Sequence, residues 1–253
     1  MRAGNLEILP ASLQRERRGR FFAYFDAVPD NDEILSLLLP DPDRLFESGE
    51  TIQSAWQSAA TDKILVNLGS GSYFLKRYNC LGGGYRLKNI FRHSRALKSW
   101  WAGWKFLELG LPTPKPIVCL EERRFRALDR SYLLLELVDG AGSLLDIWKE
   151  FNSERRRNVL ELLGAEIGRM HGLGLLHGDL NWRNILVRET PKQPEVFLVD
   201  LDGCQLIKKA SRDLAMRDLN HFFRDLQRNH SSDEETALFF QSWEKSFGLH
   251  GDN

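Results

Sequence analysis

The chain has 253 residues, of which 42% are hydrophobic and 28% charged, a composition typical of a soluble globular protein. Its 35 basic and 35 acidic residues cancel, so the net charge indicates no class of partner. Three widely spaced cysteines argue against a disulfide framework, and no apolar run is long enough to cross a bilayer. We therefore expect a cytoplasmic protein with reduced thiols, large enough for one domain of two lobes.

The first part of the chain is expected to form an N-terminal extension (residues 1–47) and a small strand-rich lobe (residues 48–138). The extension has one apolar helix candidate near residues 33–39. The small lobe is predicted to contain a weak strand at 50–57, strands at 63–68 and 72–78 around a Gly69-Ser70-Gly71 turn, a glycine-rich loop at 81–85, one main helix at 94–109, and strands at 116–120 and 131–137.

The pattern becomes mostly helical after residues 139–142, an Asp-Gly-Ala-Gly stretch that we interpret as a hinge. Residues 139–253 are predicted to contain helices at 144–151, at 153–171 with Ser153 as its cap, near 211–228 and at 233–247, with short strands at 185–187 and 196–199. The fold class is therefore α+β, with a cleft between two lobes as the expected ligand site.

The strongest chemical signal is the polar loop 177–187, which reads His-Gly-Asp-Leu-Asn-Trp-Arg-Asn-Ile-Leu-Val. Asp179 and Asn184 lie five residues apart in it, and a second apolar strand ends on Asp200. Phosphoryl transfer requires a carboxylate for the proton of the attacking hydroxyl and oxygen ligands for Mg²⁺. The competing interpretation gives these Asp and Asn residues turn and capping roles.

These motifs resemble those of the protein-kinase-like superfamily. The H-x-D-x-x-x-x-N pattern is present at His177, Asp179 and Asn184, and Asp200 matches the aspartate that opens the D-F-G motif. The resemblance implies a two-lobed kinase fold with ATP and Mg²⁺ as cofactors. It implies Asp179 as catalytic base, Asn184 and Asp200 as magnesium ligands, and Lys76 as the strand lysine that contacts the nucleotide phosphates.

Four other loop residues are open to two interpretations each. Asn181 and Arg183 are candidates near the transferred phosphate or the acceptor, or they hold the loop by hydrogen bonds. Asp202 is a candidate second metal ligand or a solvent-facing turn residue. Trp182 either stacks on a sugar or packs under the loop, whereas His177 is expected to brace the loop backbone.

Three features depart from the protein-kinase pattern. Ser99 aligns with the helix glutamate that pairs with the strand lysine, and residues 56–62, where the nucleotide loop should lie, contain no glycine. No A-P-E segment follows Asp200, which favours a small or saccharide acceptor over an extended peptide.

The chain is most similar to the bacterial lipopolysaccharide core kinases, which phosphorylate Kdo or heptose. The similarity extends over residues 63–223 and includes Arg217-Asp218-Leu219. It implies transfer to a sugar hydroxyl of the inner core, or of a lipid-linked precursor, at the cytoplasmic face of the inner membrane. Residues 63–107 contain no acidic side chain, so we expect a basic surface at residues 76–98 to meet anionic lipid.

Two other functions fit parts of the sequence. An aminoglycoside- or choline-kinase-like phosphotransferase would have the same H-G-D-L loop, and a pseudokinase scaffold of the envelope would explain Ser99. Nucleic-acid binding fits poorly, because the basic stretch matches no known nucleic-acid module.

Overall fold

The computed structural model describes residues 12–47, 60–79, 93–124 and 127–251. The chain divides into two compact units, one of Met1–Lys105 with Pro114–Leu137 and one of Phe106–Thr113 with Val138–Asn253. The weak strand expected at 50–57 and the glycine-rich loop expected at 81–85 lie outside the described residues. Among the described helices, none is both long and apolar enough to span a membrane.

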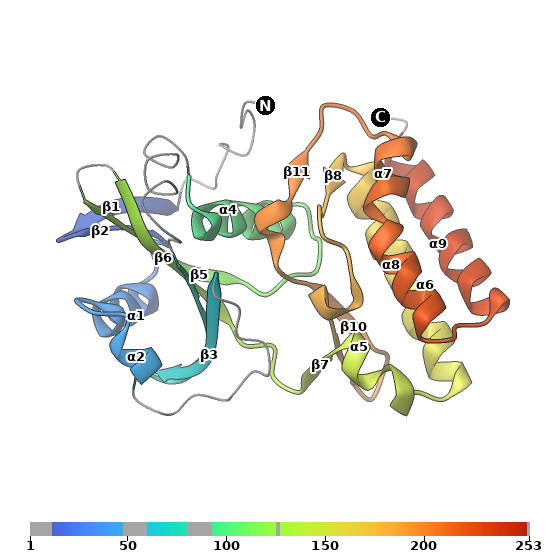
Figure 1. The fold of residues 1–253 in the computed structure, drawn as a ribbon, viewed down its shortest axis with the longest axis horizontal. Coiled ribbons are helices and arrows are strands. Elements are labelled where there is room, and N and C mark those ends of the chain that lie inside the picture. The colour runs from blue at the N-terminus through green and yellow to red at the C-terminus, as the bar shows by residue number, and fades with distance from the viewer. Residues whose placement is uncertain (1–11, 48–59, 80–92, 125–126, 252–253) are drawn as a thin grey trace. The chain divides into compact units, whose positions relative to one another are not determined.

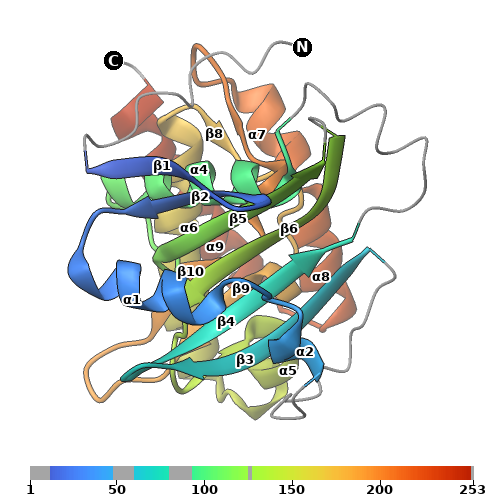
Figure 2. The same ribbon diagram turned by 90° about the vertical axis from the view of Figure 1, so that its left-hand side faces the viewer.

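The first unit is built on a six-stranded antiparallel sheet with the order β1-β2-β5-β6-β4-β3 (Figure 2). The strands are β1 (Leu13–Arg18), β2 (Phe21–Asp26), β3 (Thr61–Leu68), β4 (Gly71–Tyr78), β5 (Pro116–Arg124) and β6 (Ala127–Glu136). The predicted hairpin is confirmed between β3 and β4, where Gly69 adopts a φ of 57° that an L side chain would resist. Strands β1 and β2, within residues 1–47, were not predicted.

Both faces of this sheet are covered, because side chains alternate along each strand. On one face, Phe25 packs with Leu35 of α1 (Pro29–Leu38), and α2 (Arg44–Glu47) follows. On the other face, Tyr24 packs with Trp100 of α4 (Arg95–Glu108), the main helix predicted at 94–109. Burying each such side chain stabilises the unit by about 1.5–3 kcal/mol.

A partly buried ionic network joins Asp43, the residue before α2, to the sheet. The carboxylate of Asp43 accepts hydrogen bonds from Arg77 at 2.9 Å and from the Tyr132 hydroxyl at 2.9 Å, and it also contacts Arg130. Burial alone would raise the pKa of Asp43, but the hydrogen bonds from Arg77 and Tyr132 outweigh it and lower that pKa. Arg77 also donates to Asp62. Although Arg77 lies in the stretch 63–107 that contains no acidic residue, its positive charge is therefore paired with acids from outside that stretch.

The second unit is mostly helical, and its helices α6 and α8 both pack against α9 (Figure 1). Its helices are α5 (Leu144–Ile147), α6 (Ser153–Gly172), α7 (Arg212–Asp218), α8 (Asn220–Arg228) and α9 (Asp233–Gly251), with 3-10 turns η1 (Trp148–Glu150), η2 (Trp182–Asn184) and η3 (Leu201–Gly203). Helices α6 and α9 pack closely because Gly164 and Gly168 have no Cβ. A Cβ at either glycine would lie 2.4 Å from a backbone oxygen of α9.

One local prediction for this unit was wrong by one residue, and the structure adds detail to another. Asn152, not Ser153, caps α6, because its side-chain oxygen accepts a hydrogen bond from the Arg155 amide at 2.8 Å. The predicted hinge 139–142 is partly regular structure, since Ala141–Ser143 forms β7 and pairs with β9. The remaining strands are β8 (Leu175–Leu176), β9 (Ile185–Arg188), β10 (Glu195–Leu198) and β11 (Gln205–Leu206), in sheets ordered β10-β9-β7 and β11-β8.

Candidate active site

The loop 177–184, here called the catalytic loop, joins β8 to β9 through η2. His177 begins the loop and is fully buried. Its Nε2 donates to the Val199 carbonyl at 3.1 Å, while its Nδ1 accepts from the Asp179 amide at 3.4 Å. Burial lowers the pKa of His177, which favours the neutral ring that this pair of bonds requires. His177 therefore braces the loop backbone, as predicted.

Asp218, at the end of α7, holds the start of the catalytic loop by its backbone. Its carboxylate accepts hydrogen bonds from the amides of His177 at 2.6 Å and Gly178 at 2.7 Å, and from His171 Nε2 at 3.1 Å. Burial would raise the pKa of Asp218, but the hydrogen bond from His171 and the two backbone bonds outweigh it and lower the pKa. The carboxylate thus fixes two consecutive peptide units of the loop.

The chain of contacts behind Asp218 extends into the helical core. The indole N–H of Trp243, on α9, donates to His171 Nδ1 at 3.0 Å, so His171 has both ring nitrogens engaged. Gly178 completes the arrangement, because its φ is 85° and a Cβ there would lie 2.4 Å from the Gly203 oxygen. Glycine at position 178 is therefore required by both backbone conformation and space.

Asp179 presents its carboxylate at the surface of the second unit, where its side chain is 54% exposed. Its Oδ1 accepts a hydrogen bond from the side-chain Nδ2 of Asn181 at 3.0 Å and lies 3.2 Å from His221 Nδ1. Its Oδ2 accepts a hydrogen bond from the side-chain Nδ2 of Asn184 at 3.2 Å. Three partners fix the orientation of the carboxylate while leaving it open to solvent. This geometry suits a group that orients a hydroxyl and accepts its proton.

Asn184 and Asp200 lie next to each other in the hydrogen-bonded backbone. The Val199 amide, one residue before Asp200, donates to the Asn184 carbonyl at 2.9 Å. Asp200 has a left-handed backbone, with φ 67° and ψ 51°, an uncommon conformation for a non-glycine residue and one often associated with functional sites.

This pair fits the chemistry of a magnesium site. The side-chain nitrogen of Asn184 donates to Asp179, which leaves the amide oxygen as the atom suited to a cation. Within the described part of the chain, no three His, Cys, Asp or Glu side chains form a metal-binding cluster. One carboxylate and one amide oxygen are a typical protein contribution when Mg²⁺ is bound mainly through substrate phosphates.

The other predicted site residues are divided between the two units. Asn181 Oδ1 accepts from the Arg183 amide at 3.0 Å, so Asn181 connects η2 to the Asp179 carboxylate, and Arg183 is exposed. Asp202 is half-buried on η3. Lys76 belongs to the first unit, where its side chain on β4 is 3% exposed, and Ser99 is also buried there, on α4.

Trp182 packs inside the second unit and does not face solvent. It is fully buried, and its ring centroid lies 4.8 Å from that of Trp148 and 6.2 Å from that of Phe222. The packing interpretation of Trp182 is therefore the one that the structure supports.

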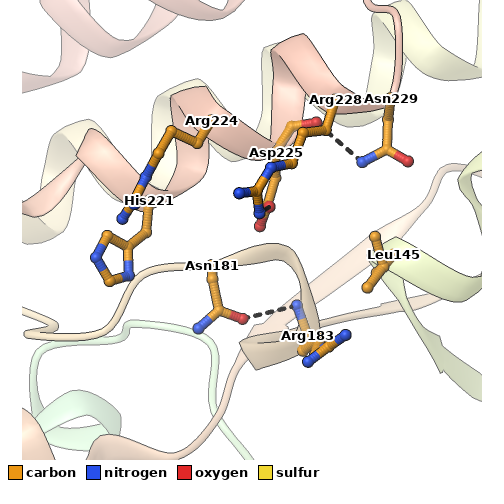
Figure 3. Close-up of a pocket in the computed structure, with 8 residues that line it drawn as sticks. All are labelled: Leu145, Asn181, Arg183, His221, Arg224, Asp225, Arg228 and Asn229. Carbon is orange, nitrogen blue, oxygen red and sulfur yellow. Dashed lines mark hydrogen bonds and ion pairs between the residues drawn. The ribbon is translucent and has the colours of Figure 1, made fainter.

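Two residues of α8 that are not among the predicted site residues contact the catalytic loop. His221 contacts Asp179, and Asp225 accepts a hydrogen bond from the Trp182 amide at 2.9 Å. The signal was present in the sequence, since His221, Asp225 and Arg228 recur at helical spacing and define one polar face. Figure 3 shows this face of α8 opposite Asn181 and Arg183.

Comparison with solved structures identifies the class of fold. The structure titled "WaaP in complex with acyl carrier protein" matches with a TM-score of 0.62 over 86% of each chain, at 16% sequence identity. The protein therefore has a protein-kinase-like fold, which confirms the expected α+β class.

Sequence comparison then identifies the family. The family model described as "Lipopolysaccharide kinase (Kdo/WaaP) family" matches residues 41–243, so the chain belongs to this family. The 3-deoxy-D-manno-octulosonic acid kinase of Mannheimia succiniciproducens is 32% identical over 76% of this chain and 81% of its own length. The corresponding kinase of Actinobacillus succinogenes is 33% identical over 38% of this chain and 40% of its own length.

The family assignment separates the functions that the sequence left open. The protein is a kinase that acts in lipopolysaccharide synthesis. The assignment favours this function over an aminoglycoside- or choline-kinase-like enzyme and over a pseudokinase scaffold.

Proposed function

We propose that this chain transfers the γ-phosphate of ATP to a hydroxyl group of Kdo (3-deoxy-D-manno-octulosonic acid) in the lipopolysaccharide inner core, or in its lipid-linked precursor. The observation that supports this acceptor is the match, over 76% of the chain, to a 3-deoxy-D-manno-octulosonic acid kinase. The geometry supports the reaction type, because Asp179 is oriented by three side chains and remains exposed.

Asp179 accepts the proton of the sugar hydroxyl as that oxygen attacks the γ-phosphorus. Asn181, Asn184 and His221 hold the carboxylate in one orientation, so less freedom is lost when the acceptor binds. The backbone bonds from the catalytic loop to Asp218 fix the position from which Asp179 acts.

Asn184 and Asp200 would hold Mg²⁺, and Lys76 would contact the α- and β-phosphates of ATP. When bound, the magnesium ion would neutralise charge on the nucleotide phosphates. Arg183 and Asn181 are proposed to lie near the transferred phosphate or the acceptor, and Asp202 is proposed as a ligand of a second metal.

We also propose that the reaction occurs in the cytoplasm, at the inner-membrane surface, with basic residues of the stretch 76–98 attracting anionic lipid. Lys98 is exposed on α4, whereas Arg77 is paired with Asp43 and Asp62. Reversing the charges of Arg86, Lys88, Arg92 and Arg95 should weaken sedimentation with anionic vesicles. Unchanged vesicle binding by the folded variant would remove the membrane part of the proposal.

The acceptor is tested with purified protein, Mg²⁺ and γ-labelled ATP. The panel comprises Kdo-bearing lipid A, a heptose-bearing core lacking phosphate, an aminoglycoside, choline and a generic protein. We expect label in the Kdo-bearing acceptor that depends on Mg²⁺ and disappears on chelation. Label that requires heptose, or that enters only the amine or alcohol, would contradict the proposed acceptor.

A further inference from the structure

A pocket of about 420 Å³ lies beside the catalytic loop, wholly within the second unit (Figure 3). Its size is within the range of pockets that bind small molecules. All but one of its lining residues are polar or charged. The argument concerns His221, Arg224, Asp225 and Arg228 of α8 and Asn181 and Arg183 of the catalytic loop.

The charge of this pocket is positive. Three arginines line it against one carboxylate, Asp225, whose Oδ2 already accepts the Trp182 amide. Within the described residues Arg224 forms no ion pair, and Arg228 is 74% exposed with its nearest acid, Asp225, 4.0 Å away. Guanidinium groups that are not closely paired with an acid, as at Arg224 and Arg228, favour an anionic ligand, and planar oxyanions in particular.

The pocket adjoins the proposed catalytic base. Asn181 and His221 both line the pocket, and both contact Asp179 Oδ1, at 3.0 and 3.2 Å. A ligand held in the pocket would therefore bring a neighbouring hydroxyl close to Asp179. Every residue of the pocket, and Asp179 beside it, belongs to the second unit.

We propose that this pocket binds the carboxylate of the acceptor sugar acid, with Arg224 and Arg228 as specificity-determining residues. The inference rests on the proposed function, because Kdo is an acid and heptose is a neutral sugar. The proposal predicts selectivity for Kdo over heptose, because the arginines bind the carboxylate while a hydroxyl of the same sugar faces Asp179.

The test combines Arg224→Gln and Arg228→Gln with two acceptors, Kdo-lipid A and its Kdo methyl ester. Arg157→Gln is the matched control, because Arg157 is exposed on α6 and does not line the pocket. Loss of one charge-assisted contact should raise KM for the acid about ten- to hundredfold. The KM for ATP and the melting temperature should stay unchanged, and the ester should be an equally poor acceptor for wild type and both variants. An equal loss with acid and ester would overturn the inference.

A binding measurement separates this inference from the proposed function. Free Kdo, its methyl ester and inorganic phosphate are titrated without nucleotide against wild type, Arg224→Gln and Arg157→Gln. Arg224-dependent binding of Kdo but not its ester supports the carboxylate site even if no Kdo is phosphorylated, in which case only the proposed function fails. Arg224-dependent binding of phosphate with no preference for Kdo over its ester would assign the pocket to a phosphate group and overturn the carboxylate.

Discussion

Asp43 in the first unit and Asp218 in the second both join segments that are distant in sequence, but they do so with different partners. Asp43 accepts from the charged side chains of Arg77 and Arg130 and from the Tyr132 hydroxyl. Asp218 accepts from an imidazole and from two consecutive backbone amides of the catalytic loop. Both carboxyl groups have pKa values below their ordinary range.

The two sets of partners indicate different roles: Asp43 stabilises the fold of the first unit, whereas Asp218 fixes the backbone of the catalytic loop. Side-chain partners, as at Asp43, connect α2 to the strands without dictating the path of the backbone at either end. Backbone partners, as at Asp218, determine the path of the loop at His177 and Gly178, the two residues that precede Asp179. We therefore expect changes at Asp43 to reduce stability and changes at Asp218 to reduce both stability and turnover.

The largest effect is expected at the group that Asp218 positions. Asp179→Asn removes the proton acceptor while keeping the size of the side chain, and general-base catalysis is typically worth about 10²–10⁴-fold in rate. We expect kcat to fall by that factor with little change in melting temperature, because Asp179 is exposed. The exposed Asp213→Asn on α7 is the control, and comparable losses in the two variants would contradict the assignment.

Asp218→Asn should lower both stability and kcat. The side chain of Asp218 is 5% exposed and accepts three hydrogen bonds, of which an asparagine side chain could accept only some. We therefore expect the free energy of unfolding to fall by about 2–4 kcal/mol. The activity of the folded fraction should also fall about tenfold or more, because the loop is no longer fixed. Urea denaturation and initial rates below the transition give the two numbers, and full activity per folded molecule would refute the positioning role.

Asp43→Asn should affect stability alone. Loss of the charged acceptor leaves Arg77 and Arg130 less well compensated, at a cost of about 1–3 kcal/mol in the free energy of unfolding. We expect kcat to stay within about twofold of wild type once the folded fraction is matched. A kcat loss like that of Asp218→Asn would erase the contrast between the two carboxylates.

The smallest effect is a pH dependence at His177. Burial lowers the pKa of its folded form below 6.5, so between the two pKa values the unfolded chain binds more protons than the folded one. Its contribution to stability is therefore complete above pH 6.5 and declines as the pH falls, by at most about 1.4 kcal/mol per pH unit. Urea denaturation from pH 7.5 to 5.5 should show a steeper decline for wild type than for His177→Gln, and parallel curves would contradict it.

The sequence predicted the position of the loop 177–184, between a long helix and a short strand, because the signals for it are local. His177, Asp179 and Asn184 lie within eight residues of one another, and the same short segment supplies the contact between Asn184 and Asp179. The main helix of the first unit and the hairpin at Gly69 were predicted for the same reason, since periodicity and turn residues are short-range signals.

What the sequence did not predict depends on contacts between distant segments. Strand β1 is Leu-Gln-Arg-Glu-Arg-Arg, a charged run that is a strand because it pairs with β2 at the edge of the sheet. Asp218 was noticed only within a motif, and His221 was overlooked, because α7 and α8 approach the loop forty residues after it in sequence. Only the packing of these helices gives both residues their roles.

Locating the new phosphate shows directly whether the protein phosphorylates Kdo. Kdo-bearing lipid A is treated with the protein, Mg²⁺ and ATP, the ketosidic bond is cleaved with mild acid, and both fragments are analysed by mass spectrometry. We expect one added phosphate in the Kdo fragment with wild type and none with Asp179→Asn. Phosphate in the lipid A fragment, or an equal yield from Asp179→Asn, would contradict it.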